Sequence, residues 1–153
     1  MIGNLSTPLR LAAAFLIDLS VMPAGAETNR VTFPENLEEM EHYTTVTRSE
    51  VEEMLTTREA IEAAKAGEPM PYGTHVVIRF LRDGEVTRWF VMQRGEGWGA
   101  DYPDGRTEDW QFQWFNADRT VNLAENTGRC MACHSGRTED QFTFTYDALR
   151  AFD

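Results

Sequence analysis

Alternation of apolar and polar side chains predicts several β-strands in the second half of the chain. Residues 73–81 (GTHVVIRFL) and 86–94 (VTRWFVMQR) both show this pattern. Asp83 and Gly84 lie between the two runs. An Asp-Gly pair flanked by such runs is a strong hairpin signal. The pattern therefore predicts an antiparallel β-hairpin.

The clearest alternation occurs in residues 109–115 (DWQFQWF). Trp110, Phe112 and Trp114 fall on one face of this strand, and the two glutamines between them fall on the other. The aromatic face is expected to belong to the core. A fourth strand is predicted over residues 43–48 (YTTVTR), which are rich in β-branched side chains.

Helical signals are fewer and shorter. Residues 56–67 (TTREAIEAAKAG) predict a helix in which Thr56 is the N-cap, Glu59 completes a capping box and Gly67 ends the helix. Two further short helices are predicted over residues 34–43 and 146–152. Strands and short helices together indicate the α+β class.

Length and charge limit the organisation of the chain. The 153 residues are enough for one domain. The chain has 25 acidic and 14 basic side chains and a formal net charge of −11. Such a surface repels nucleic acid and anionic lipid, so we expect no nucleic-acid partner. The main consequence of the charge is solubility.

The first 26 residues have the pattern of a secretory signal peptide. Arg10 precedes the apolar run 11–17 (LAAAFLI), Pro23 breaks a helix, and residues 24–26 (AGA) form a small-x-small cleavage pattern. The alternatives are an ordinary N-terminal helix and an uncleaved anchor. We therefore expect residues 1–26 to be removed and residues 27–153 to form a periplasmic domain.

Both cysteines of the chain lie in one motif, Cys130-Met131-Ala132-Cys133-His134. A disulfide between them would close a very small loop and would do little to restrain the unfolded chain. Cys-x-x-Cys-His is the attachment signature of c-type haem. On a helix, residues three apart share a face. Cys130 and Cys133 can therefore form thioethers with one porphyrin edge, and His134 can ligate the iron.

Two other kinds of Cys-x-x-Cys site fit the sequence less well. A structural zinc site needs four ligands, and the remaining histidines, His42 and His75, are far away in sequence. A thioredoxin-like redox pair is expected to follow a strand early in a βαβ unit, which the sequence around residues 130–133 does not show. One covalently attached haem c is the preferred interpretation.

The order of the elements indicates which kind of haem protein this is. Small all-helical cytochromes carry the motif near the N-terminus and recruit a later methionine as second axial ligand. Here nineteen residues follow His134, and none is methionine. The four long helices of a helical-bundle cytochrome are also missing. We therefore expect an antiparallel β-sheet with short flanking helices and a haem held against the sheet near the C-terminus.

The chain resembles the cytochrome P-460 family, which includes the related cytochromes c-prime-beta. The resemblance covers residues 33–152, and only the haem motif is specific by itself. The matching stretches are FPEN (33–36), AKAGEPMPYGT (64–74), RWFVM (88–92), DWQFQWF (109–115), RCMACH (129–134) and FTFT (142–145).

The resemblance implies a homodimer built on an antiparallel sheet, with a five-coordinate haem iron and an open distal face. His134 would be the proximal ligand. Some members of the family oxidise hydroxylamine, alone or with nitric oxide, and carry a lysine cross-linked to the porphyrin. Others lack the cross-link and bind NO or CO in an apolar pocket. A soluble redox partner is expected for the oxidising members.

Lys65 is the only lysine in the chain and precedes Ala-Gly-Glu, near the position of the lysine-rich segment of cross-linked members. The resemblance makes it a candidate haem-modifying residue with a catalytic role. The alternative is a lysine that interacts with the negative end of a helix dipole. For the distal carboxylate of oxidising members, Glu108 and Asp109 are the nearest candidates, because they precede Trp110.

The sequence is compatible with three functions. The protein is an oxidoreductase acting on hydroxylamine or nitric oxide, a binder of NO or CO without turnover, or an electron-transfer cytochrome. Met92 could supply a sixth ligand in the last case, although methionine on a strand is more often core. His75 is more often a satisfied histidine than a second ligand.

Overall fold

The computed structural model describes residues 29–102 and 106–153. It contains one five-stranded antiparallel sheet with the simple order β1-β2-β3-β4-β5. The predicted signal peptide, residues 1–26, lies outside the described residues. Within the described part of the chain, no helix has the length and apolar character needed to cross a membrane.

The strands follow one another along the chain. Their bounds are Glu41–Thr47 for β1, Val51–Thr56 for β2, His75–Arg82 for β3, Glu85–Arg94 for β4 and Trp110–Asn116 for β5. The expected hairpin joins β3 to β4, with Arg82 opposite Glu85. Asp83 and Gly84 both have positive φ, 54° and 83°, as a two-residue hairpin turn requires. The α+β class and the antiparallel sheet are therefore confirmed.

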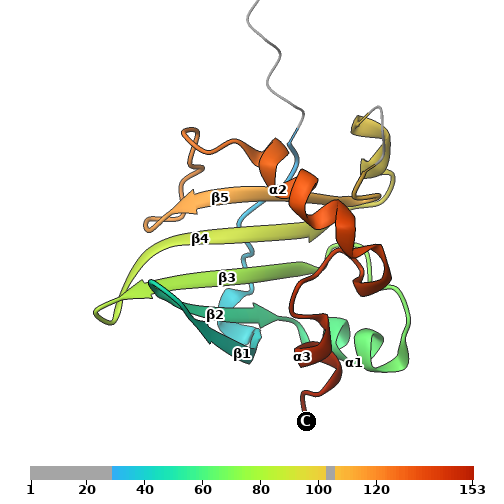
Figure 1. Cartoon of the computed structure of the whole chain (residues 1–153), viewed down its shortest axis with the longest axis horizontal. Helices are drawn as coiled ribbons and strands as arrows, with labels where there is room; N and C mark the ends of the chain where they lie inside the picture. The colour runs from blue at the N-terminus through green and yellow to red at the C-terminus, as the bar shows by residue number, and fades with distance from the viewer. Residues whose placement is uncertain (1–28, 103–105) are drawn as a thin grey trace, which may run out of the picture.

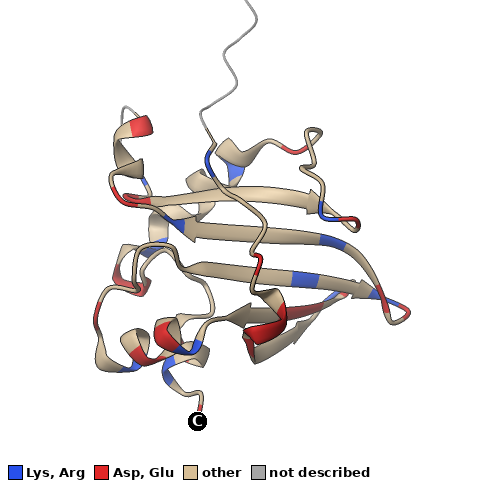
Figure 2. Cartoon of the chain, turned by 180° about the vertical axis from the view of Figure 1, so that it is seen from behind, with Lys and Arg blue, Asp and Glu red and all other residues tan. Residues whose placement is uncertain are grey.

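Short helices surround the sheet. The α-helices are α1 (Arg58–Ala66), α2 (Thr127–His134) and α3 (Tyr146–Arg150), and the 3-10 helices are η1 (Leu37–Glu39), η2 (Trp98–Asp101) and η3 (Ser135–Asp140). The segment from α2 to α3 crosses one side of the sheet, which we call the front face (Figure 1). The segment before β1 crosses the opposite side, the back face (Figure 2).

The prediction of a helix over residues 34–43 is wrong. This segment forms one turn of 3-10 helix, η1, and then enters β1 at Glu41. Asn36 makes no side-chain capping bond. Leu37 and Met40 are buried against the back face, and Glu41 pairs with Thr56 of β2. Burial against the sheet and strand pairing therefore override the local helical pattern.

The strand β2 was not predicted. Glu52, Glu53 and Met54 lie at its centre, and these residue types favour helix over strand in isolation. The strand nevertheless pairs with β1 on one side and β3 on the other. Its existence therefore depends on its neighbours in the sheet.

The helix α1 begins one residue later than predicted. Thr57, not Thr56, is the N-cap, and its hydroxyl accepts a hydrogen bond from Ala60 N at 3.3 Å. Thr56 is the last residue of β2, and its hydroxyl donates to His75 O at 2.7 Å. The predicted capping box with Glu59 is therefore wrong. Gly67 ends the helix at φ 72°, as predicted.

Two apolar cores lie on the two faces of the sheet. Along β3, β5 and the part of β4 from Arg88 onward, even-numbered residues point to the front and odd-numbered residues to the back. The front core includes Val76, Phe80, Phe90, Met92, Trp110 and Phe112, and the α2 residue Met131 packs into it. The back core is smaller and includes Leu37, Leu55, Val77, Trp89, Val91 and Phe115.

Candidate functional site

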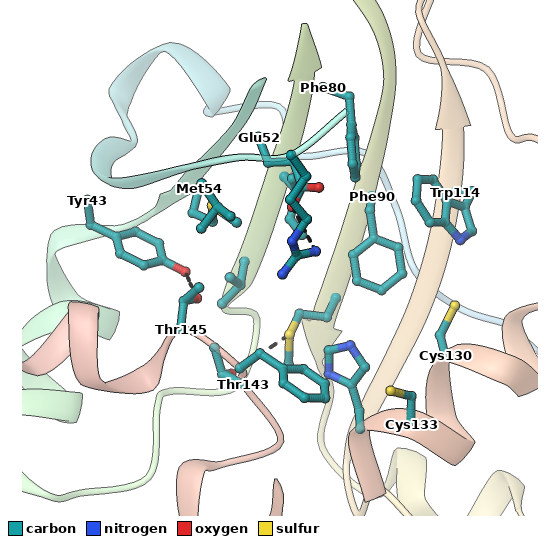
Figure 3. Close-up of a pocket in the computed structure, with 17 residues that line it drawn as sticks. Tyr43, Glu52, Met54, Phe80, Phe90, Trp114, Cys130, Cys133, Thr143 and Thr145 are labelled. Atoms are coloured by element: carbon teal, nitrogen blue, oxygen red, sulfur yellow. Dashed lines mark hydrogen bonds and ion pairs between the residues drawn. The ribbon is translucent and has the colours of Figure 1, made fainter. Parts of the chain in front are cut away.

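The predicted motif lies on α2, as expected. The N-cap of this helix is Asn126, whose side chain accepts a hydrogen bond from Gly128 N at 3.0 Å. Met131 anchors the helix in the front core with 1% of its surface exposed. Cys130 and Cys133 are one turn apart, and neither is part of a disulfide. The short helix thus presents both sulfur atoms on the side that faces the sheet (Figure 3).

A cavity of about 700 Å³ lies on the front face, and Cys130, Cys133 and His134 of this helix form one of its walls. Its volume lies within the range of about 300–1,000 Å³ that is typical of ligand and cofactor sites. The walls are formed by residues of all five strands, by α2 and by the segment that follows η3. They consist of Tyr43, Val46, Arg48, Glu52, Met54, Val76, Ile78, Phe80, Phe90, Met92, Trp114, Cys130, Cys133, His134, Thr143, Phe144 and Thr145.

The imidazole of His134 is held by a backbone carbonyl and by aromatic rings. Its Nδ1 donates a hydrogen bond to Phe142 O at 2.6 Å. The ring centroid lies 4.6 Å from that of Phe112, 4.9 Å from that of Phe144 and 5.9 Å from that of Phe90. Because Nδ1 carries the proton, the lone pair is on Nε2. This is the atom that a metal ligand requires.

Burial affects the acid–base properties of the motif. It lowers the pKa of His134, although the hydrogen bond to Phe142 opposes the shift. Burial also raises the pKa of the Cys130 thiol, against a smaller opposing effect of the Trp114 side chain. At neutral pH the histidine is therefore the neutral imidazole that ligates metals.

Opposite the motif, one ion pair interrupts the apolar walls. Arg48 Nη1 lies 3.5 Å from Glu52 Oε2. The Glu52 side chain is 12% exposed, whereas that of Arg48 is 70% exposed. Sequence reasoning missed Glu52 because β2 was not recognised. Without that strand, no pattern placed its carboxylate on the front face.

The two carboxylates suggested by the sequence lie elsewhere. Asp109 accepts hydrogen bonds from the Tyr72 hydroxyl at 3.0 Å and from Gly99 N at 3.1 Å. Glu108 lines a separate, smaller cleft of about 200 Å³. Neither contributes to the wall of the large cavity. The structure therefore replaces both with Glu52 as the acidic residue of the site.

Lys65 lies in the last turn of α1. Its Nζ is 3.4 Å from Glu62 Oε1, and its side chain is 35% exposed. It is not among the residues that line the cavity. This placement agrees with a lysine at the negative end of a helix dipole. The haem cross-link remains a prediction.

Met92 and His75 lie on opposite faces of the sheet. Met92 lines the cavity with 2% of its surface exposed, and the Thr143 hydroxyl lies 3.8 Å from its sulfur atom. His75 is on the back face, 3.5 Å from the Thr32 hydroxyl, and burial lowers its pKa. His75 is therefore remote from any iron ligated by His134.

The residues of this cavity fit a haem. The cavity offers a large apolar space, two thiols one helical turn apart and a histidine with its metal-binding nitrogen available. A zinc site fits less well, because the described residues contain no cluster of three or more histidine, cysteine or acidic side chains.

Comparison with known proteins agrees with this chemistry. Among curated proteins, none matches the chain. The family model described as cytochrome P460 matches residues 32–145, which include the whole sheet, the motif and the entire cavity wall. The chain therefore belongs to the cytochrome P460 family and is a haem cytochrome.

Proposed function

We propose that the protein is an exported mono-haem c-type cytochrome that performs redox chemistry on hydroxylamine or nitric oxide. Cys130 and Cys133 hold the haem through thioethers, and His134 Nε2 is the proximal iron ligand. The observation that carries this proposal is the position of all three side chains in the wall of one apolar cavity. The bound haem supplies a site for a small nitrogen ligand and accepts electrons one at a time.

The protein surrounding the haem has three tasks. The backbone carbonyl of Phe142 fixes the tautomer of His134 and increases the basicity of its Nε2. The apolar walls exclude water from the ligand. Glu52 is the carboxylate that can accept a proton when hydroxylamine is oxidised. Arg48, which is largely exposed, pairs with this carboxylate.

The haem assignment is tested by mass and by spectrum. The exported protein is expected to have the mass of residues 27–153 plus one haem, and its ferrous form is expected to be high-spin and to respond to NO or CO. A mass without an added tetrapyrrole would refute the proposal. A low-spin spectrum that is inert to ligands would instead indicate an electron carrier.

The catalytic part is tested by replacing Glu52. Glu52→Gln is expected to lower hydroxylamine oxidation by roughly 10²- to 10⁴-fold, the usual contribution of a general base. The matched control is Glu53→Gln. Glu53 is the next residue of β2, points to the opposite face and pairs with Arg79 at 2.7 Å. Equal activity of the two variants would remove Glu52 from the mechanism.

Reversible binding of NO or CO without turnover is the second candidate function. The position of Lys65 outside the cavity wall favours it, because the cross-link is characteristic of the oxidising members that the chain resembles. A ferrous Soret band shifted far to the red would show the cross-link and favour the enzyme. If Lys65→Ala changes neither the spectrum nor hydroxylamine turnover, the cross-link is excluded.

A further inference from the structure

The carbonyl that accepts the hydrogen bond from His134 belongs to an unusual piece of backbone. Gln141 and Phe142 are consecutive residues with φ of 49° and 59°, and neither is glycine. This left-handed conformation is disfavoured for residues with a Cβ and persists only where surrounding contacts impose it. The conformation turns the chain back toward α2 immediately after η3.

Two backbone hydrogen bonds close the turn itself. Gln141 N donates to Thr138 O at 3.2 Å, and Phe142 N donates to Arg137 O at 2.7 Å. Both partners lie in η3, so these bonds define the local turn. They do not tie it to the rest of the protein.

The side-chain amide of Gln141 makes that longer-range connection. Its Oε1 accepts a hydrogen bond from Met70 N at 2.8 Å. Its Nε2 donates to Glu68 O at 2.7 Å and lies 3.1 Å from the Tyr146 hydroxyl. Glu68 and Met70 follow α1, about seventy residues earlier in the chain. One amide therefore joins the turn to the loop after α1 and to α3.

We propose that Gln141 is a positioning residue for His134. Its amide holds the left-handed turn so that the Phe142 carbonyl faces His134 Nδ1. Groups that hydrogen-bond a metal-ligating histidine set its orientation and raise its basicity. Gln141 acts on His134 indirectly, through the Phe142 carbonyl, because it contacts neither the histidine nor the large cavity.

The inference rests on the proposed role of His134 as an iron ligand. Without the Gln141 amide, the turn is free to relax and the bond from Nδ1 to the Phe142 carbonyl weakens. A less basic imidazole donates less charge to iron and stabilises the ferric state less. The reduction potential is then expected to rise, and the iron–histidine bond to weaken.

Two substitutions separate the amide from the backbone. Gln141→Ala removes the amide and keeps a Cβ, whereas Gln141→Gly removes the amide and also relieves the positive φ. We expect both to lower the iron–histidine stretching frequency of the ferrous haem and to raise its midpoint potential. Exchange of the His134 ring N–H proton, followed by NMR, is expected to become several-fold faster.

Gln111→Ala is the matched control. Like Gln141, Gln111 is a glutamine with hydrogen bonds at both ends of its amide, but it is fully buried and lies on the back face. It is expected to lose stability without changing the three haem-side measurements. Gln141→Glu keeps the acceptor for Met70 N and is expected to restore part of the stretching frequency.

The experiments distinguish a failure of the proposed function from a failure of the role proposed for Gln141. A wild-type mass without haem would refute the proposed function and remove the basis of this inference. Attached haem with normal ligation, but with all three measurements unchanged in both Gln141 variants, would overturn only the inference. A shift in the glycine variant alone would assign the effect to the backbone conformation at residue 141 and would also overturn the role of the amide. If the alanine and glycine variants do not fold, Gln141→Glu decides by the same measurements.

Discussion

The two faces of the sheet are completed in different ways. On the back face, the polypeptide itself covers the strands. Residues 29–40 lie across it, and Phe33 packs edge-on against Trp89 and Phe115 at ring distances of 5.3 Å. On the front face, α2 packs against β5, and the cavity of about 700 Å³ lies beside it over the other strands.

Polar side chains follow the same division. The back face contains buried glutamines that bind the covering segment. Gln111 Oε1 accepts from Arg30 N at 2.8 Å, and Gln113 Oε1 accepts from Asn29 Nδ2 at 2.8 Å. The front face is apolar apart from the motif, a few hydroxyls and the pair Arg48–Glu52. The back face is therefore covered by a segment of the chain that hydrogen-bonds to it, whereas the front face is suited to a large apolar cofactor.

The two faces are expected to contribute to stability in different ways. The back face is expected to contribute to folding with or without a cofactor. The front face is expected to reach its full stability only when haem is bound, because a ligand that binds the folded state alone stabilises it. Changes on the two faces should therefore have separable effects.

Replacing both thiols is expected to have the largest effect. Cys130→Ser with Cys133→Ser removes both attachment points, so the added haem mass should disappear. Thermal unfolding of the product is expected to occur well below that of the wild type. Cys133→Ser alone, which keeps one thioether position, is the matched control. If the double variant retains covalent haem, the front face is not completed in the way described.

A neighbouring pair on β4 compares the faces directly. Trp89 points to the back core and Phe90 to the front core, where its ring lies 5.0 Å from that of Trp114. Trp89→Leu is expected to cost about 2–4 kcal/mol of unfolding free energy and to leave the haem spectrum unchanged. Phe90→Leu should cost less and should alter the spectrum or the affinity for NO or CO. Urea unfolding and ligand titration measure the two effects.

The hydrogen bonds that attach the N-terminal covering segment to the back face are expected to contribute less to stability. Gln111→Ala leaves Arg30 N without its side-chain acceptor and removes the hydrogen bond to Asp101 Oδ2, while Asp101 Oδ1 keeps its bond to the Arg30 side chain; the expected cost is about 1–3 kcal/mol. Proteolysis near residues 29–32 should become faster, while ligand binding at the haem stays the same. Unchanged cleavage would show that the glutamines do not hold the covering segment.

The smallest effect is expected at the rim of the front face. Arg88 lies over the rings of Phe80 and Trp114 and pairs with Glu50 at 2.6 Å. Burial raises the pKa of Glu50, but the hydrogen bond from Thr87 and the charges of Arg88 and Arg82 outweigh it, so the net pKa is lowered.

The sign of the pH dependence follows from this lowering. Ionised Glu50 stabilises the folded protein at pH above its ordinary pKa of 4.5, and this contribution is lost as the pH falls through the folded-state pKa. Glu50→Gln is therefore expected to be less stable than wild type at neutral pH, with a gap that closes in acid. Urea unfolding of both proteins at neutral and at acid pH measures this difference in unfolding free energy. A difference that does not change with pH would contradict the assignment.

Local features of the chain were sufficient for much of the fold. The period-two pattern identified β3, β4 and β5, and Asp83-Gly84 identified the turn between β3 and β4. These signals work because a strand alternates its faces and a two-residue turn needs positive φ. The spacing of Cys130, Cys133 and His134 likewise indicated the chemistry before any geometry was known, since one helical turn places both thiols on one side.

Tertiary structure decided the features that depend on distant neighbours. The strand β2 exists because β1 and β3 pair with it, and only that pairing brings Glu52 into the cavity. The orientation of His134 depends on a carbonyl eight residues away, and that turn is tied to a loop about seventy residues earlier. Local periodicity shows which face a side chain occupies. Only the folded chain determines what lies opposite that face, because long-range contacts leave no regular spacing in the sequence.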